Sequence, residues 1–212
     1  MILLKEQILR GIKEKKIIVE PFIEDNLAVN SLDVRLSKHL LTYVPTKIIK
    51  LKNGKKMMVK DMEILRKMDT YIEEIDNIYI SMREDNKIFE TEIPEDGVIL
   101  LPNMLFLGST MEKAGSDYYI PMYEGRSSIG RLGLESHISA GFGDLGFKSN
   151  WTLEITVVDP LEVFPEKRIG QVYFLEGDEN EVKIAMDSGF EYKGKYTDQP
   201  KPQASKSYLD KI

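Results

Sequence analysis

The sequence predicts a mainly β fold, a sandwich or barrel of antiparallel strands. Short apolar stretches recur along the chain and are separated by turn-forming Gly, Pro, Asn and Asp residues. Hardly any stretch has the periodicity of a helix. A chain of 212 residues with 42% hydrophobic and 30% charged residues can bury one sizeable core. We therefore expect one β domain.

Composition excludes several classes of protein. The chain has no cysteine, which rules out disulfides and any cysteine-held zinc site. A net charge of -6 argues against a general nucleic-acid surface. No apolar run is long enough to span a bilayer, and the N-terminus lacks a signal-peptide pattern. We expect a cytoplasmic protein that binds neither nucleic acid nor membrane.

The first elements are a short helix and two strands. Residues 3–15 place apolar side chains at four-residue intervals, which predicts an amphipathic helix with one buried face formed by Leu4, Ile8 and Ile12. The following IIVEPF reads as a strand that Pro21 stops. In NSLDVRLSKHLLTYV, apolar residues alternate with Asp33 and Arg35, which predicts a half-buried strand. Asp33 and Arg35 either brace a site or subunit contact or lie on a plain exposed face.

A charged middle segment, about 46–90, follows. Asn53-Gly54 lies between two short apolar stretches and predicts a hairpin turn, because both residues tolerate positive φ. Residues 62–75 fit a helix or a strand equally well by periodicity. If the whole segment is an insertion between core strands, its charged side chains face solvent and take no part in catalysis.

The later strands are expected in PEDGVILLPNMLFLGSTMEK, LGLESHISA, TLEITVVDP and LEVFPEKRIGQVYFLE. After Glu176 the chain becomes polar, with several lysines and tyrosines. Such a segment cannot fold alone. It is either a frayed terminus or a segment that becomes ordered over a ligand.

The stretch from Tyr123 to Glu154 concentrates the chemistry. Six glycines there alternate with polar and charged residues. Its guanidiniums and hydroxyls suit phosphate oxygens, and its carboxylates suit a sugar hydroxyl or a general base. Together they indicate a nucleotide-sized polyanion site beside an acid–base group, formed by Arg126, Ser127, Ser128, Arg131, His137, Asp144 and Glu154.

GRSSIGRLGL, HISAGFGDLGF and TLEI follow one another with an order and spacing that resemble the dCTP deaminase branch of the trimeric dUTPase superfamily. The resemblance implies a distorted jelly-roll or β-barrel of the dUTPase type, with a short N-terminal helix and a flexible C-terminal lid. It also implies a homotrimer with active sites at subunit interfaces. We expect a domain over 1–190, containing the charged segment 46–90, and a lid over 191–212.

The resemblance assigns roles to individual residues. Glu154 would be the catalytic carboxylate, whereas an isolated glutamate in such a strand would only face solvent. Arg131 and Ser127 would help to hold the reacting water. Arg126, Ser127 and Ser128 would bind phosphates, and Asp144 would bind the 3′-hydroxyl and orient a hydrolytic water. The remaining expected nucleotide contacts are main-chain groups around Ile138 and Ala140, then Gln171, Tyr192, Lys195, Tyr196 and Gln199. His137 is expected only to support the site.

The implied activity is zinc-independent deamination of dCTP. Gly141 and Phe142 resemble the bifunctional members, which also release pyrophosphate and form dUMP. Magnesium would arrive with the triphosphate, and dUTP and dTTP are further candidate ligands. Two alternatives stay open: a dUTP/dCTP diphosphohydrolase without deamination, and a non-catalytic nucleotide-sensing trimer. Leu145 and Ser149-Asn150 depart from the family pattern beside Asp144.

Overall fold

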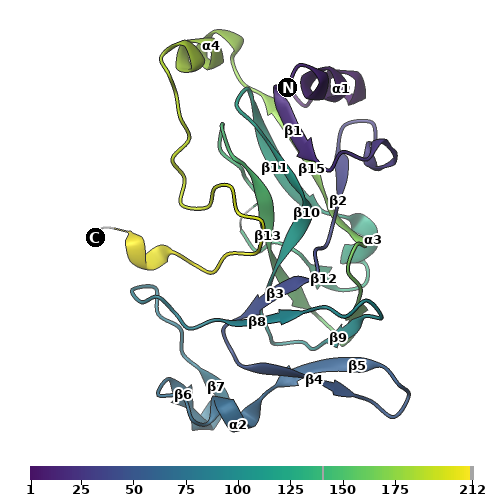
Figure 1. Cartoon of the computed structure of the whole chain (residues 1–212), viewed down its shortest axis with the longest axis vertical. Helices are drawn as coiled ribbons and strands as arrows, with labels where there is room; N and C mark the ends of the chain where they lie inside the picture. The colour runs from purple at the N-terminus through teal and green to yellow at the C-terminus, as the bar shows by residue number, and fades with distance from the viewer. Residues whose placement is uncertain (140, 211–212) are drawn as a thin grey trace.

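The computed structural model describes residues 1–139 and 141–210. Its largest sheet has the strand order β12-β13-β10-β3-β8, with β1 also paired to β10. These strands are β12 (Leu134–Glu135), β13 (Lys148–Val157), β10 (Phe106–Ser116), β3 (His39–Thr42), β8 (Phe89–Glu92) and β1 (Ile17–Glu20). β10 and β13 are the long strands at its centre (Figure 1).

Three smaller sheets surround this one. The first has the order β11 (Tyr119–Gly125), β15 (Arg168–Glu176) and β2 (Leu32–Arg35). The second has the order β14 (Leu161–Val163), β9 (Val98–Leu100), β5 (Lys56–Lys60) and β4 (Thr46–Lys50). The third pairs β6 (Tyr71–Ile72) with β7 (Asn77–Ile78). The mainly β class is confirmed, although none of these sheets closes on itself within the described residues.

The helical segments are short. They are α1 (Lys5–Lys13), α2 (Met62–Leu65), α3 (Ser127–Gly130) and α4 (Glu179–Asp187), with 3-10 turns η1 (Glu24–Asn26), η2 (Glu73–Ile75) and η3 (Ser207–Leu209). Across the part of the chain that the structure describes, no helix has both the length and the apolar character needed to cross a bilayer.

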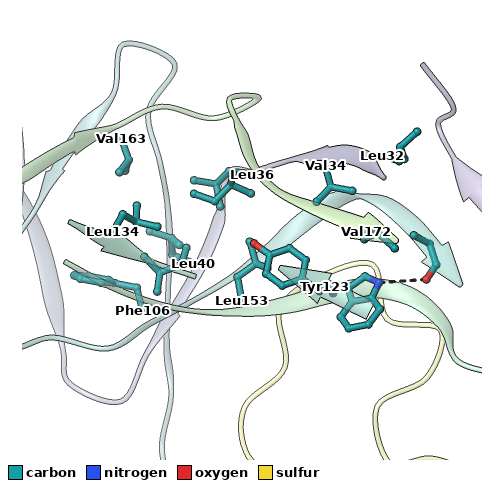
Figure 2. Packing of buried hydrophobic residues seen from close by; sticks show 14 of the residues in the cluster. Leu32, Val34, Leu36, Leu40, Phe106, Tyr123, Leu134, Leu153, Val163 and Val172 are labelled. Carbon is teal, nitrogen blue, oxygen red and sulfur yellow. Dashed lines mark hydrogen bonds between the residues drawn. The ribbon is translucent and has the colours of Figure 1, made fainter. Parts of the chain in front are cut away.

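The core lies between the sheets. Alternate side chains of β13 are buried, among them Trp151, Leu153 and Ile155. Figure 2 shows Leu153 beside Tyr123, with Val172 of β15 and Val34 of β2 in the same cluster. The expected alternation in β2 is confirmed, because Leu32 and Val34 are buried while the side chains between them are half-buried.

The predicted helical face was partly wrong. Ile8 is fully buried, but Leu4 is 55% exposed and Leu3 is buried instead. The chain before α1 runs along β15, where the Leu3 amide donates to the Phe174 carbonyl at 3.0 Å. That contact turns Leu3 inward and Leu4 outward, so helical spacing does not govern position 4.

Two segments differ from the expected elements. LGLESHISA forms a strand only at β12, because the amides of Ile138 and Ser139 bond a carboxylate instead of a neighbouring strand. Helix α4 was not predicted. It begins at Asp178, whose side chain accepts hydrogen bonds from the amides of Asn180 and Glu181. An N-cap Asp with Glu three residues later is a helix-start signal that the polar composition obscured.

The middle segment contributes to the core. Its hairpin, β4–β5, turns at Gly54, which has φ +85° as expected for this turn. β5 pairs with β9, and Met58 on β5 is fully buried. Leu65 at the end of α2 is also fully buried. The segment therefore extends the sheet β14-β9-β5-β4, and its exposed lysines and glutamates face solvent.

The register of β10 against β13 shifts at one point. Between the pairs Ser109–Thr152 and Lys113–Asn150, β10 has residues 110–112 while β13 has only Trp151. The Trp151 amide donates to Thr110 Oγ1 at 2.9 Å, and Asn150 Nδ2 donates to the carbonyls of Thr110 and Met111, each at 3.0 Å. Such a bulge redirects a side chain that a regular strand would orient differently.

The redirected side chain is Glu112, which is 1% exposed. Its carboxylate accepts hydrogen bonds from Arg35 at two points, from Nε at 2.7 Å and from the backbone amide at 2.8 Å. This buried ion pair joins β10 of the largest sheet to β2 of the sheet β11-β15-β2. A buried carboxylate with two charge-assisted partners is satisfied, whereas one without them is strongly destabilising.

We expect Arg35→Met to lower the free energy of unfolding by about 3–5 kcal/mol, because Glu112 would stay buried without its cation. Chemical denaturation measures the change. Lys67→Met is the control, since Lys67 and Glu63 form an exposed pair, and its loss should cost no more than about 0.5 kcal/mol. Equal effects in the two variants would contradict a structural role for the Arg35–Glu112 pair.

Candidate functional site

Glu154 lies on the half-buried face of β13, opposite Leu107 of β10. Its Oε2 atom accepts two backbone hydrogen bonds, from the Ile138 amide at 2.7 Å and from the Ser139 amide at 3.1 Å. No residue in 1–139 or 141–210 donates to its Oε1 atom. The carboxylate is thus fixed through one oxygen, and the other can act on a bound water.

Glu154 lies in a cavity of about 530 Å³. Asp144 also lines this cavity and is exposed, in the connection between β12 and β13. The structure therefore places both predicted carboxylates in one cavity. Both apolar and polar side chains form the rest of its lining, among them Tyr43, Ile80, Phe142, Trp151 and Thr152.

The C-terminal segment covers this cavity. In Figure 1 it runs in yellow from α4 down beside β13. Tyr192, Tyr196 and Gln199 all line the cavity. The Tyr192 ring packs edge-on against Phe147 at 6.2 Å between centroids. Burial, with the Asp144 carboxylate as a second cause, raises the pKa of Tyr192. Three of the four predicted tail residues therefore line the cavity that contains the two carboxylates.

The fourth tail residue, Lys195, does not line the cavity. It forms an ion pair with Asp210 farther along the tail. Tyr196 also has a structural partner, because its hydroxyl accepts a hydrogen bond from the Lys206 amide at 2.7 Å. The tail thus folds on itself around residues 195–210.

The predicted phosphate-binding residues lie elsewhere on the chain. Arg126, Ser127, Ser128 and Gln171 line a second cavity, of about 790 Å³. Arg126 Nε is 3.1 Å from Asp33 Oδ1, so the Asp33 side chain orients this guanidinium. The side-chain oxygen of Gln171, Oε1, accepts a hydrogen bond from Ser31 Oγ at 3.0 Å. Of the two interpretations of Asp33, the structure favours bracing over a plain exposed face.

One segment lies between the two cavities. Ser136 and His137 line the second cavity, while Ile138 and Ser139 line the first. His137 packs edge-on against Tyr123, with ring centroids 5.5 Å apart, and lies 3.6 Å from Glu124. Tyr123 in turn donates to Ser136 Oγ at 2.8 Å. These contacts brace the dividing segment. Within one chain, the two carboxylates and the predicted phosphate-binding residues therefore face different cavities.

Three further predicted residues are Arg131, Ile138 and Ala140. Arg131 is exposed at the end of α3 and lines neither cavity. The Ile138 amide bonds Glu154, which leaves only its carbonyl to read a base. Ala140 lies outside the described residues. Among the described residues, no group of three or more His, Asp or Glu side chains is arranged to hold a metal ion.

Sequence reasoning missed Tyr43, Ile80 and Gln203 as cavity residues. Tyr43 follows β3 and Ile80 follows β7, far from the glycine-rich stretch in sequence. No local motif marks them, since they reach the cavity only through the pairing of distant strands and the path of the tail.

Comparison with known proteins shows the family of this chain. The dCTP deaminase-like family matches residues 2–177. A "dCTP deaminase, dUMP-forming" of Clostridium acetobutylicum is 36% identical over 202 residues, covering 93% of this chain and 92% of the relative. The protein of the same name from Hathewaya histolytica is 37% identical over 166 residues, covering 77% and 78%.

A solved structure shares the fold. The crystal structure of 2′-deoxycytidine 5′-triphosphate deaminase from Agrobacterium tumefaciens matches with a TM-score of 0.54 at 17% identity. The match covers 89% of this chain and 53% of that one, so this chain spans about half the length of the matched protein. At this identity the match shows the fold alone, which is mainly β. The family match and the relatives show more: the chain belongs to the dCTP deaminase-like family, and the expected resemblance is confirmed.

Proposed function

We propose that this protein deaminates dCTP by hydrolysis and converts the product to dUMP and pyrophosphate. The observation that carries the proposal is the Glu154 carboxylate, held through Oε2 by two backbone amides in a cavity that also contains Asp144. Relatives at 36–37% identity bear the name "dCTP deaminase, dUMP-forming".

In the first step, water adds to C4 of cytosine. Glu154 takes one proton from that water as the new C–O bond forms. Its Oε1 atom, which the backbone amides leave free, therefore acts as the general base. The same carboxyl then returns that proton to the departing amine, the C4–N4 bond breaks and ammonia leaves. The proton that remains on the C4 oxygen moves to N3, which leaves the C4 carbonyl of dUTP. The amides of Ile138 and Ser139 keep the carboxylate in place throughout. Ser127 and Arg131 help to hold the water.

We further propose that each complete site is shared between two copies in a homotrimer. Within one chain, the carboxylates face the cavity under the tail, while Arg126, Ser127 and Ser128 face the other cavity. A nucleotide needs both sets, because one binds phosphates and the other acts on base and sugar. If a neighbouring copy placed its Arg126 cavity against the Glu154 cavity of this chain, both sets of residues would face one nucleotide. Gln171 would then lie beside the phosphate groups.

Magnesium belongs to the substrate in this proposal. The described residues offer no group of three or more metal ligands, and Mg²⁺ is commonly bound through substrate phosphates. The ion would enter on the triphosphate oxygens, and dUTP and dTTP would occupy the same cavity as the substrate. Tyr192, Tyr196 and Gln199 line the tail side of that cavity, so residues 191–212 would act as a lid that excludes water.

The second step uses Asp144. This exposed carboxylate lies in the cavity with Glu154 but on a different element, so it can orient a separate water toward the α-phosphate. The same observation supports the alternative function, a diphosphohydrolase that acts without deamination. Ammonia and pyrophosphate release from dCTP and dUTP distinguishes the two, and a nucleotide-sensing protein would release neither.

We expect Glu154→Gln to reduce ammonia release from dCTP by a factor of at least about 10²–10⁴, since glutamine keeps the shape but cannot accept the proton. Ammonia production and equilibrium dCTP binding are measured on the same preparation. Binding should change little. Near-normal ammonia release by the variant would assign the base to another group.

Asp144→Asn should leave ammonia release in place and stop the second step, because an amide cannot orient the hydrolytic water as a carboxylate does. Chromatography of the products from dCTP should then show dUTP in place of dUMP. Continued dUMP formation would show that Asp144 is not needed for pyrophosphate release.

Mixing two inactive variants tests the shared site. Ser127→Ala alters one cavity and Glu154→Gln the other. If each site takes its halves from different copies, trimers reassembled from both variants contain some sites with both halves intact. Ammonia release should then return to part of the wild-type level. A mixture as inactive as its parents would place both sets of residues in one chain's site.

A further inference from the structure

The C-terminal tail crosses β13 by means of its backbone. The Gln199 amide donates to Ser149 Oγ at 2.9 Å, and the Gln203 amide donates to Thr152 Oγ1 at 3.1 Å. The Ser205 amide donates to the Tyr43 hydroxyl at 2.8 Å. Three hydroxyls of the β domain thus accept hydrogen bonds from three backbone amides of the tail.

The end of the tail rests on the middle segment. Ser207 Oγ, in η3, donates to the Met82 carbonyl at 2.9 Å. Met82 belongs to the loop between β7 and β8. In Figure 1 this loop rises toward the yellow tail on the side of the molecule where the chain ends.

That loop is held in shape by one side chain. Asn86 Oδ1 accepts from the Ser81 amide at 2.8 Å, and Asn86 Nδ2 donates to the carbonyls of Ser81 and Glu84 at 2.7 and 3.0 Å. Ile80, two residues before Met82, lines the cavity of Glu154. The loop therefore meets both the tail and the candidate active site.

We propose that Tyr43, Ser149, Thr152 and the Asn86-braced loop form a tail seat, which fixes the C-terminal segment over the cavity of Glu154 in the same chain. Its members are positioning residues: they act through the tail, whose Tyr192 and Tyr196 line that cavity. The proposal gives a function to the charged middle segment. It rests on the proposed function for its effect on catalysis, although the seat itself is defined by protein contacts alone.

The seat contacts the tail through its backbone. The three hydroxyls accept hydrogen bonds from backbone amides of the tail, and Ser149 Oγ also donates to the Gln199 carbonyl at 3.3 Å. The seat therefore fixes the path of the chain and leaves the side chains of Tyr192 and Tyr196 free to face the cavity.

Amide hydrogen exchange of the full-length protein without nucleotide tests the seat directly. Thr152→Val removes one acceptor, and exchange of the Gln203 amide should accelerate by about three- to tenfold. Thr156→Val is the matched control, because Thr156 lies on the same face of β13 and does not bond the tail in the described structure. Tyr43→Phe should accelerate exchange of the Ser205 amide in the same way, with Tyr173→Phe of β15 as its control.

The loop is tested by Asn86→Ala, which should accelerate exchange across residues 199–207 with little change in the thermal midpoint. Asn53→Ala is its control, since Asn53 braces a different loop by accepting from the Lys55 amide. Kinetics then link the seat to catalysis: KM for dCTP should rise in the seat variants by about the factor seen in exchange, because the docked tail is less populated.

Two results would overturn the proposal whatever the enzyme does. The tail amides could show no protection from exchange in the wild type, or their exchange rates could be unchanged in all three seat variants. Accelerated exchange with an unchanged KM would overturn the catalytic role of the seat. A protein that shows the exchange pattern but never releases ammonia would refute the proposed function and leave the seat intact.

Discussion

The buried contact between Glu112 and Arg35 is the constraint on which much of this structure depends. It exists because β10 has three residues where β13 has one, and because Thr110 and Asn150 hold that irregularity in place. The bulge points a carboxylate across to β2, and Arg35 satisfies it twice. Two residues along β2, Asp33 orients the guanidinium of Arg126. One irregularity in a central strand is thus connected, through Arg35 and Asp33 of β2, to the cavity lined by Arg126.

β13 connects the core to the candidate site by simple alternation. Its inward side chains, Trp151, Leu153 and Ile155, fill the core, and its other face presents Thr152 and Glu154. On that face one residue seats the tail and the next polar residue bears the proposed base. Period-two geometry therefore places the proposed base and a contact of the tail on one strand face.

The dividing segment around His137 explains why a single chain looks incomplete. Ser136 and His137 face the cavity of Arg126, and Ile138 and Ser139 face the cavity of Glu154. The same segment supplies the amides that hold Glu154, so a change on one side of it reaches the other. If sites are shared between copies, each chain contributes to two of them, and this segment belongs to both.

The sequence alone determined the class of fold, most strand positions, the hairpin at Asn53-Gly54 and the family, because each depends on local alternation, turn residues or a spaced motif. It also predicted site residues, Glu154, Asp144 and those of the GRSS motif, whose roles stay a proposal. Only the tertiary structure decided that these fall into two cavities, that Leu3 rather than Leu4 is buried, and that the Ile138 amide holds Glu154. Tyr43, Ile80 and Asn86 acquire their positions through strand pairing and loop contacts between distant residues. Side chains of that kind leave no periodic or local trace in a sequence, since their partners are chosen by the packing of the whole chain.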